Sequence, residues 1–238
     1  SQRISWVRVF SVERIGLHII GIVSGIAKTG EADMQTTRMD RLPADDAWCP
    51  WTPGEVTDRL AKLAVPWHVV GGWALDIWHG RQTRPHSDLE IAVLRTDLPI
   101  VRQSFADCRL AVADAGIVSP LADDSEPEPE AHQVWIAELI ADCWRLDLML
   151  EPGDREVWVY RRNPILRRDR SLMIDRSDTD IPYLRPEAVL LFKAKALRDK
   201  DEADFTASVG LLDYSARDWL RSALNSEHPH HPWIDRLT

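Results

Sequence analysis

Gly71-Gly-Trp-Ala-Leu-Asp-Ile-Trp-His-Gly80-Arg-Gln-Thr-Arg-Pro-His-Ser-Asp88-Leu-Glu90 is the stretch that decides how this chain folds. The apolar run Trp67–Val70 before it predicts a strand that leads directly into the two glycines. Trp73–His79 then predicts a short helix that ends at Gly80. Asp88–Leu94 alternates and predicts a second strand. A strand, a glycine turn and a helix in this order let backbone N–H groups approach an anion closely.

Three acidic residues accompany this glycine turn. Asp88 and Glu90 occupy positions i and i+2 of the second expected strand, on one face and with Cα atoms roughly 6.6 Å apart. Two carboxylates on one face repel each other unless a cation lies between them. Mg²⁺ is suited to this position, because it binds one or two carboxylates together with phosphate oxygens. Asp147 lies in another expected strand, 144–150, where a carboxylate between leucines is costly unless it is paired or metal-bound. Together these acids predict a two-metal site for phosphoryl or nucleotidyl transfer.

Each acid also has a structural interpretation. Asp88 and Glu90 could be two solvated acids on an exposed sheet edge, and Asp147 could form a salt bridge with a nearby arginine. His86 lies two residues before Asp88. We expect it to be held by structural hydrogen bonds rather than to order a metal loop.

The quoted stretch resembles the signature of polymerase-β-type nucleotidyltransferases. It is most similar to the aminoglycoside 2''-adenylyltransferase-like group, with the lincosamide nucleotidyltransferases as relatives. Further segments follow in the order that this group uses, namely His132–Trp135, Trp158–Arg162, Pro182–Glu187, Leu191–Lys195, Lys200–Phe205 and His231–Trp233. The resemblance covers about residues 53–237.

An α+β fold follows from the order of the expected elements and from this resemblance. The resemblance implies a polymerase-β-like nucleotidyltransferase domain, with a mixed twisted sheet and helices, followed by a small C-terminal helical domain. We expect the first domain over 40–160, an Arg-rich connector over 161–182 and the helical domain over 183–238. Residues 1–39 are interpreted as an N-terminal extension that is non-native or weakly ordered, with a signal peptide as the alternative.

The helical domain is expected to contain three helices. They are predicted from Pro186 to Ala196, from Asp201 to Leu212 and from Ala216 to Leu224. Ser215 and Asp218 have the spacing of a capping box for the third.

The resemblance implies that the three acids bind metal. Asp88 and Glu90 would bind Mg²⁺, and Asp147 would complete the triad, bind the second of two ions and act as general base. Glu90 stands where many relatives have Asp, and its additional methylene leaves the metal geometry less constrained.

The resemblance also implies a nucleotide site. Gly71 and Gly72 would contact the phosphates, and Arg84 would bind the triphosphate together with Lys193 or Lys195 from the helical domain. The arginines of 161–170 either line this site or form a solvated surface.

The implied reaction transfers NMP from ATP, or another NTP, to an aminoglycoside hydroxyl and releases pyrophosphate, which would confer antibiotic resistance. The alternatives are a lincosamide acceptor, a protein or tRNA acceptor, and a nucleotide-binding protein without turnover. Intact Asp88, Glu90 and Asp147 argue against the last of these.

Composition narrows the class of partner. The 29 basic and 38 acidic residues give a net charge of −9, which disfavours a nucleic-acid partner and suits a cationic small molecule. No apolar run reaches transmembrane length. Three widely spaced cysteines (Cys49, Cys108 and Cys143) predict neither a disulfide scaffold nor a zinc site, and a reducing cytoplasm is the expected location.

Overall fold

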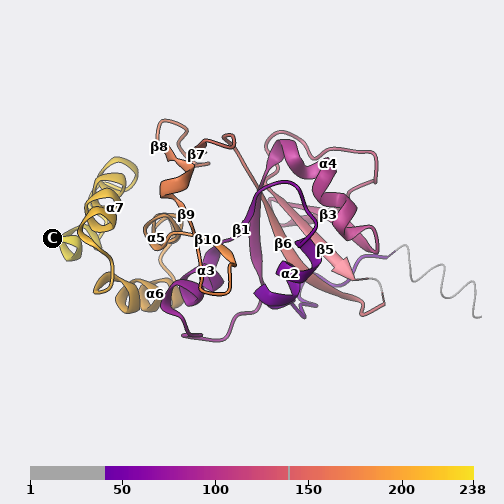
Figure 1. Cartoon of the computed structure of the whole chain (residues 1–238), viewed down its shortest axis with the longest axis horizontal. Helices are drawn as coiled ribbons and strands as arrows, with labels where there is room; N and C mark the ends of the chain where they lie inside the picture. Colours follow the sequence, from indigo (N-terminus) through magenta and orange to yellow (C-terminus); the bar gives the residue numbers. More distant parts are fainter. Residues whose placement is uncertain (1–40, 139) are drawn as a thin grey trace, which may run out of the picture. The chain divides into compact units, whose positions relative to one another are not determined.

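The computed structural model describes residues 41–138 and 140–238, so the extension expected over 1–39 lies outside the described residues. Leu42–Thr238 form one compact unit, a mixed sheet with helices (Figure 1). Its helices are α2 (Pro53–Leu60), α3 (Gly71–His79), α4 (Leu98–Val101), α5 (Pro186–Lys193), α6 (Asp199–Val209) and α7 (Tyr214–Glu227). Single 3-10 turns cover Arg95–Asp97, Arg102–Phe105, Arg170–Leu172 and Ile234–Leu237. The α+β class predicted from the sequence is confirmed.

The sheet has eight strands in the order β4-β3-β5-β6-β2-β1-β10-β9. These are β1 (Trp67–Val69), β2 (Glu90–Leu94), β3 (Cys108–Asp114), β4 (Ile117–Pro120), β5 (Gln133–Glu138), β6 (Cys143–Glu151), β9 (Ile174–Arg176) and β10 (Pro182–Leu184). The pairs β2/β6 and β1/β10 are parallel, and the other pairs are antiparallel. β7 (Val157–Val159) and β8 (Arg167–Asp169) form a separate two-stranded sheet.

The core extends from the sheet into the C-terminal helices. Ile91 on β2 and Leu148 on β6 are fully buried, as strands with both faces covered require. Phe205 on α6 stacks on Trp233 with ring centroids 4.1 Å apart, and α5 packs against both α3 and α7 (Figure 1). The C-terminal helices therefore hold α3, which begins at Gly71 and so includes both glycines, two residues earlier than expected. Among the described residues, no helix is both long and apolar enough to cross a membrane.

Several elements differ from those expected. The expected connector 161–182 contains β8, β9 and the first residue of β10. The sequence did not predict these strands, because three residues are too few to show a periodic pattern and their stability comes from neighbouring strands. The boundaries proposed after residues 160 and 182 stay a prediction. The capping box expected from Ser215 and Asp218 is wrong, because α7 begins earlier and Asp213 caps it by accepting from the Ala216 backbone N–H.

A disulfide between Cys49 and Cys143 corrects the interpretation of the cysteines. The two residues are 94 positions apart in sequence, but a parallel bridge between Trp48 and Trp144 brings their Cα atoms to 6.0 Å. Spacing along the chain gave no sign of this pairing, which depends on tertiary structure. Disulfides are rare in the cytoplasm, so the pairing also gives a chemical test of the proposed location.

Replacing Cys49 with Ser is expected to lower the free energy of unfolding by about 2–4 kcal/mol, because the cross-link restricts a long loop in the unfolded chain. Denaturant titration of both proteins without reductant measures this difference. Adding reductant should lower the wild type to the level of the variant. A thiol titration of unfolded, unreduced wild type that finds three free cysteines instead of one would contradict the pairing.

Candidate active site

Parallel pairing of β2 and β6 brings two of the three predicted acids together. Glu90 and Asp147 are register partners, and the Asp147 backbone N–H donates to the Leu89 carbonyl at 2.8 Å. β2 begins only at Glu90, so Asp88 lies in the loop before the strand rather than within it. The expected strand spacing of Asp88 and Glu90 is therefore corrected.

Asp147 is buried, with 4% of its surface exposed. Its Oδ2 accepts from Gln133 Nε2 at 2.8 Å, whereas its Oδ1 has no hydrogen-bond partner among the described residues. Burial, together with the negative charges of Glu90 and Asp88, raises the pKa of Asp147 well above its ordinary value. No arginine pairs with it among the described residues, so the salt-bridge interpretation of Asp147 is wrong.

Glu90 is partly buried beside the glycine turn. Burial and the charge of Asp88 raise its pKa, while the cationic side chains of Lys193, Lys200 and Arg198 oppose this shift. The Asp88 backbone carbonyl accepts from Trp73 Nε1 at 3.1 Å, which fixes the end of the loop against α3.

Gly71 is the glycine that lies against Glu90. Its φ is +64°, and a Cβ built there would overlap the carboxylate oxygen Oε2 of Glu90. Gly72 is closed off differently, since a Cβ there would lie 2.5 Å from Arg84 Nη2 and 2.6 Å from the His86 ring. Only Gly71 therefore opens toward the acids and the cavity described below.

Changing Gly71 to Ala is expected to lower turnover at least tenfold, because the new methyl group must displace Glu90 and the backbone has a left-handed conformation. Gly116→Ala is the matched control, since Gly116 also has positive φ but has open space around it. Circular dichroism and the melting temperature separate general strain from the local effect. Equal turnover in the two variants would contradict the role of Gly71.

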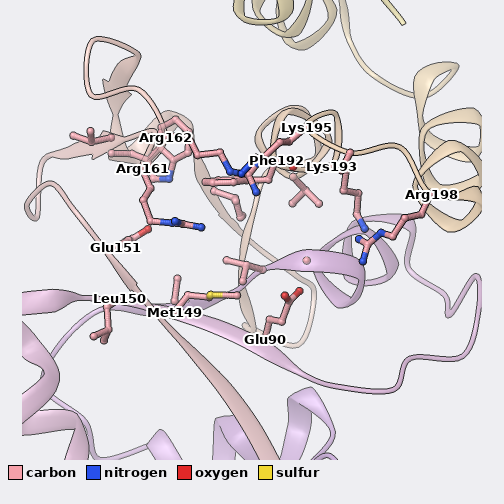
Figure 2. A pocket seen from close by; sticks show the side chains of 18 residues that line it. Glu90, Met149, Leu150, Glu151, Arg161, Arg162, Phe192, Lys193, Lys195 and Arg198 are labelled. Carbon is pink, nitrogen blue, oxygen red and sulfur yellow. Dashed lines mark hydrogen bonds between the residues drawn. The ribbon is translucent and has the colours of Figure 1, made fainter. Parts of the chain in front are cut away.

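A cavity of about 380 Å³ opens beside Gly71 and Glu90. Figure 2 shows Arg161 and Arg162 on one side of it and Lys193 and Arg198 on the other. Lys195 completes the basic lining, and Glu90 and Glu151 are its acidic members. Glu151 pairs with the buried Arg170, so its charge is already compensated. The cavity is thus suited to a polyanion.

Two residues predicted for the nucleotide site lie elsewhere or are already paired. Arg84 does not line the cavity, and its Nε and Nη2 donate to Asp204 at 2.9 and 3.0 Å. Lys193 does line it, but its Nζ contacts Asp201 at 3.1 Å and Asp204 at 2.9 Å. Lys195 lines the cavity and has no ion pair with the described residues. The expectation that Arg84 is available to a triphosphate is therefore not met by this arrangement.

Arg161 is the clearest addition to the predicted site. It is half-buried in the cavity wall and forms no hydrogen bond or ion pair with the described residues. Burial and the neighbouring Arg162 lower its pKa, as expected for a cation without compensation. Arg162 instead donates to the Phe192 carbonyl at 2.7 Å. Sequence showed a cluster of arginines here, but not which of them would be unpaired.

The rest of that arginine cluster is structural or exposed. Arg168 lies 3.8 Å from Glu187, and Arg170 is buried against Glu151. Arg167 donates to the Pro164 carbonyl on the surface. Arg161 and Arg162 thus line the cavity, and Arg167 is exposed, as the two interpretations expected. Arg168 and Arg170 follow neither interpretation, because they pair with buried glutamates.

His86 follows its structural interpretation. Its Nε2 lies 2.5 Å from Asp76 Oδ2, and both side chains are buried. Its ring packs on Trp73 with centroids 4.7 Å apart.

The acidic residues fit a divalent cation by their chemistry. Carboxylate oxygens are preferred by Mg²⁺, and the buried Asp147 Oδ1 is unpartnered, next to Glu90. Within 41–138 and 140–238, however, no group of three His, Cys, Asp or Glu side chains is already gathered as a metal site. The ligands are thus of the right type, but the triad is not preassembled.

A solved structure has a fold similar to that of this chain. The chain resembles the solution structure of the antibiotic-resistance factor ANT(2'')-Ia, with a TM-score of 0.51 and 14% identity over 74% of this chain and 90% of that one. It therefore has the polymerase-β-like nucleotidyltransferase fold. Residues 54–161 match the family model of aminoglycoside-2''-adenylyltransferases, which confirms the group that the sequence resembles.

More distant likenesses were also found. The lincomycin-bound lincosamide adenylyltransferase LnuA is 19% identical, with a TM-score of 0.46 over 64% of this chain and 91% of that one. A nucleotidyltransferase-like protein from Paracoccidioides brasiliensis is 14% identical, with a TM-score of 0.41 over 82% and 93%. No curated protein matches the sequence significantly.

Proposed function

We propose that this protein transfers the nucleoside monophosphate of ATP, or of another NTP, to a hydroxyl group of an aminoglycoside and thereby confers resistance. The observation that carries the proposal is the register of Glu90 and Asp147 beside Gly71, at the edge of a basic cavity. The family match over 54–161 supports the type of reaction and of acceptor.

The chain's own residues suit the steps of this transfer. Asp88, Glu90 and Asp147 would hold Mg²⁺, which supplies charge neutralisation at the reacting phosphate when bound. Asp147 would take the proton of the acceptor hydroxyl as its oxygen bonds to the α-phosphorus and the bond to pyrophosphate breaks.

The nucleotide and the acceptor would bind on different sides of the acidic residues, because the charge of the protein differs between those sides. The basic cavity would hold the nucleotide phosphates, with Lys195 and Arg161 available to them. Asp88 and Asp147 do not line this cavity. Because the attacking and leaving oxygens lie roughly in line in phosphoryl transfer, the acceptor would approach from the side of these two acids. The net charge of −9 would draw a cationic acceptor toward the protein.

A lincosamide is the second candidate acceptor, and the basic cavity favours it. Arg161 and Lys195 form no ion pair within 41–138 and 140–238, so their charge repels a polycation that reaches past Glu90. A less charged drug avoids this repulsion.

The test is pyrophosphate release from ATP, GTP, CTP and UTP with Mg²⁺ across a panel of aminoglycosides and lincosamides. We expect a drug-dependent signal and a product heavier by one NMP in mass spectrometry. The panel profile then distinguishes the two acceptor classes. No release with any pair, alongside measurable nucleotide binding, would favour a macromolecular acceptor or a non-catalytic nucleotide-binding protein. The proposed cytoplasmic location is tested separately, by trapping thiols in the intact cell. Cys49 and Cys143 recovered as free thiols would support a reducing cytoplasm, and their recovery as a disulfide would contradict it.

A further inference from the structure

Asp204 on α6 joins two cationic side chains that come from distant parts of the chain. It accepts from Arg84 Nε at 2.9 Å and Nη2 at 3.0 Å, and its Oδ2 also lies 2.9 Å from Lys193 Nζ. Its side chain is 4% exposed, so these bonds are shielded from solvent. Paired hydrogen bonds between a guanidinium and a carboxylate fix direction as well as distance.

On one side, this contact fixes the loop that carries Asp88. Arg84 lies in that loop, with its Nη2 packed against Gly72 and its Nη1 3.1 Å from His86 Nδ1. His86 is in turn held by Asp76 of α3 at 2.5 Å. The loop 81–88 is attached to α3 at several points, because the Thr83 backbone N–H also donates to Asp76 at 3.0 Å and the Asp88 carbonyl accepts from Trp73. Its attachment to α6 is made by Arg84 through Asp204.

On the other side, the contact fixes a basic residue of the cavity wall. Lys193 ends α5 and is 9% exposed. Its second partner is Asp201, at 3.1 Å, which also binds Arg198. The positive charges of Lys193 and Arg198 oppose the rise in the pKa of Glu90, so their field reaches this acid.

Stability alone gives little reason for this arrangement. A buried ion pair roughly balances its own desolvation, and apolar residues of similar volume often stabilise a fold as well or better. The geometry has a clearer consequence, because one carboxylate joins Arg84 of the Asp88 loop directly to Lys193 of the cavity wall. If Asp204 were absent, Asp201 would remain as the partner of Lys193, and Arg84 would lose its only ion pair among the described residues.

We propose that Asp204 is a positioning residue of the nucleotide site, which holds the loop 81–88 and Lys193 at a fixed separation. This inference rests on the proposed function for its effect on the nucleotide. Its effect on the loop does not depend on that function.

The test compares Asp204→Asn with Asp218→Asn, a matched change in an exposed ion pair on α7. For Asp204→Asn we expect the Kd for Mg-ATP, measured without acceptor, to rise about 10–100-fold, as for other supporting residues around a metal site. Hydrogen exchange over 81–88 should also become faster. The control should change neither quantity. In a double-mutant cycle, adding Arg84→Met to Asp204→Asn should cause little further loss.

A folded Asp204→Asn protein with exchange over 81–88 and an ATP Kd within about twofold of wild type would overturn the inference. If wild type binds no nucleotide, the proposed function fails, but the exchange measurement still decides whether Asp204 holds the loop. If Asp204→Asn does not fold, Arg84→Lys decides, since it keeps the charge and loses the paired geometry. Unchanged exchange over 81–88 in that variant would overturn the inference as well.

Discussion

Asp88→Asn is expected to abolish nucleotidyl transfer while the protein remains folded. The change removes one charge from the group formed with Glu90 and Asp147, whose pKa values already respond to Asp88. A metal-binding carboxylate contributes several kcal/mol to the transition state, so kcat/KM should fall at least about 10³-fold. The fold should not change, because Asp88 contacts α3 through its backbone carbonyl, which the variant retains.

Drug-dependent pyrophosphate release and the melting temperature measure the two halves of this prediction. Asp123→Asn is the control, as the same change in an exposed loop, and it should leave both quantities at the wild-type value. Turnover in Asp88→Asn close to that of wild type would contradict the role of Asp88 as a metal ligand.

Asp147→Asn is expected to be inactive and, in the absence of metal, more stable than wild type. The side chain is buried with one unpartnered oxygen beside another carboxylate. An amide keeps an acceptor for Gln133 and removes the buried charge. At neutral pH this should add about 1 kcal/mol to the free energy of unfolding, as functional sites commonly sacrifice stability.

The pH dependence of both effects follows from the raised pKa of Asp147. Its folded pKa lies above its unfolded value, so its favourable contribution is complete below the ordinary carboxyl pKa and is lost as pH rises through the raised value. The stability gap between variant and wild type should therefore widen with pH across that window. Wild-type turnover requires the deprotonated base and should fall as pH drops through the pKa of the loaded enzyme.

Denaturant unfolding in chelator, at several pH values, measures the stability gap. Asp114→Asn serves as the control because it makes the same change at an exposed position of the same sheet. Stability of Asp147→Asn below that of wild type at neutral pH would show that the buried carboxylate is compensated. Activity that persists in this variant would assign the general base elsewhere.

Local pattern was enough to predict the elements next to the glycine turn. β1, α3 with Gly80 as its end, β5 and β6 lie where apolar periodicity and glycine indicate them. Short strands such as β9 and β10 could not be predicted, because their pairing partners lie more than 100 residues away or within an irregular segment. The disulfide was missed for the same reason.

The residues of the candidate site could also be predicted only in part. Asp147 could be singled out because an acid inside an apolar strand is costly and therefore conspicuous. Asp88 and Glu90 could be singled out because two acids two residues apart follow the glycine turn. The partners of the basic residues could not, because a cation along a sequence carries no sign of which carboxylate it will meet. Arg84, expected at the phosphates, is paired with Asp204, whereas Arg161 in the cavity wall has no ion pair in the part of the chain that the structure describes.

By itself, the sequence determined the class of fold, the glycine turn and the three acids, because each depends on residue types at short and fixed spacing. Only the tertiary structure decided that Glu90 and Asp147 are neighbours, which glycine faces them and which cations remain available. Those outcomes depend on strand register and on ion pairs between α6, α5 and the loop 81–88. Such contacts join residues far apart in the chain, so their geometry exists only after the chain has folded.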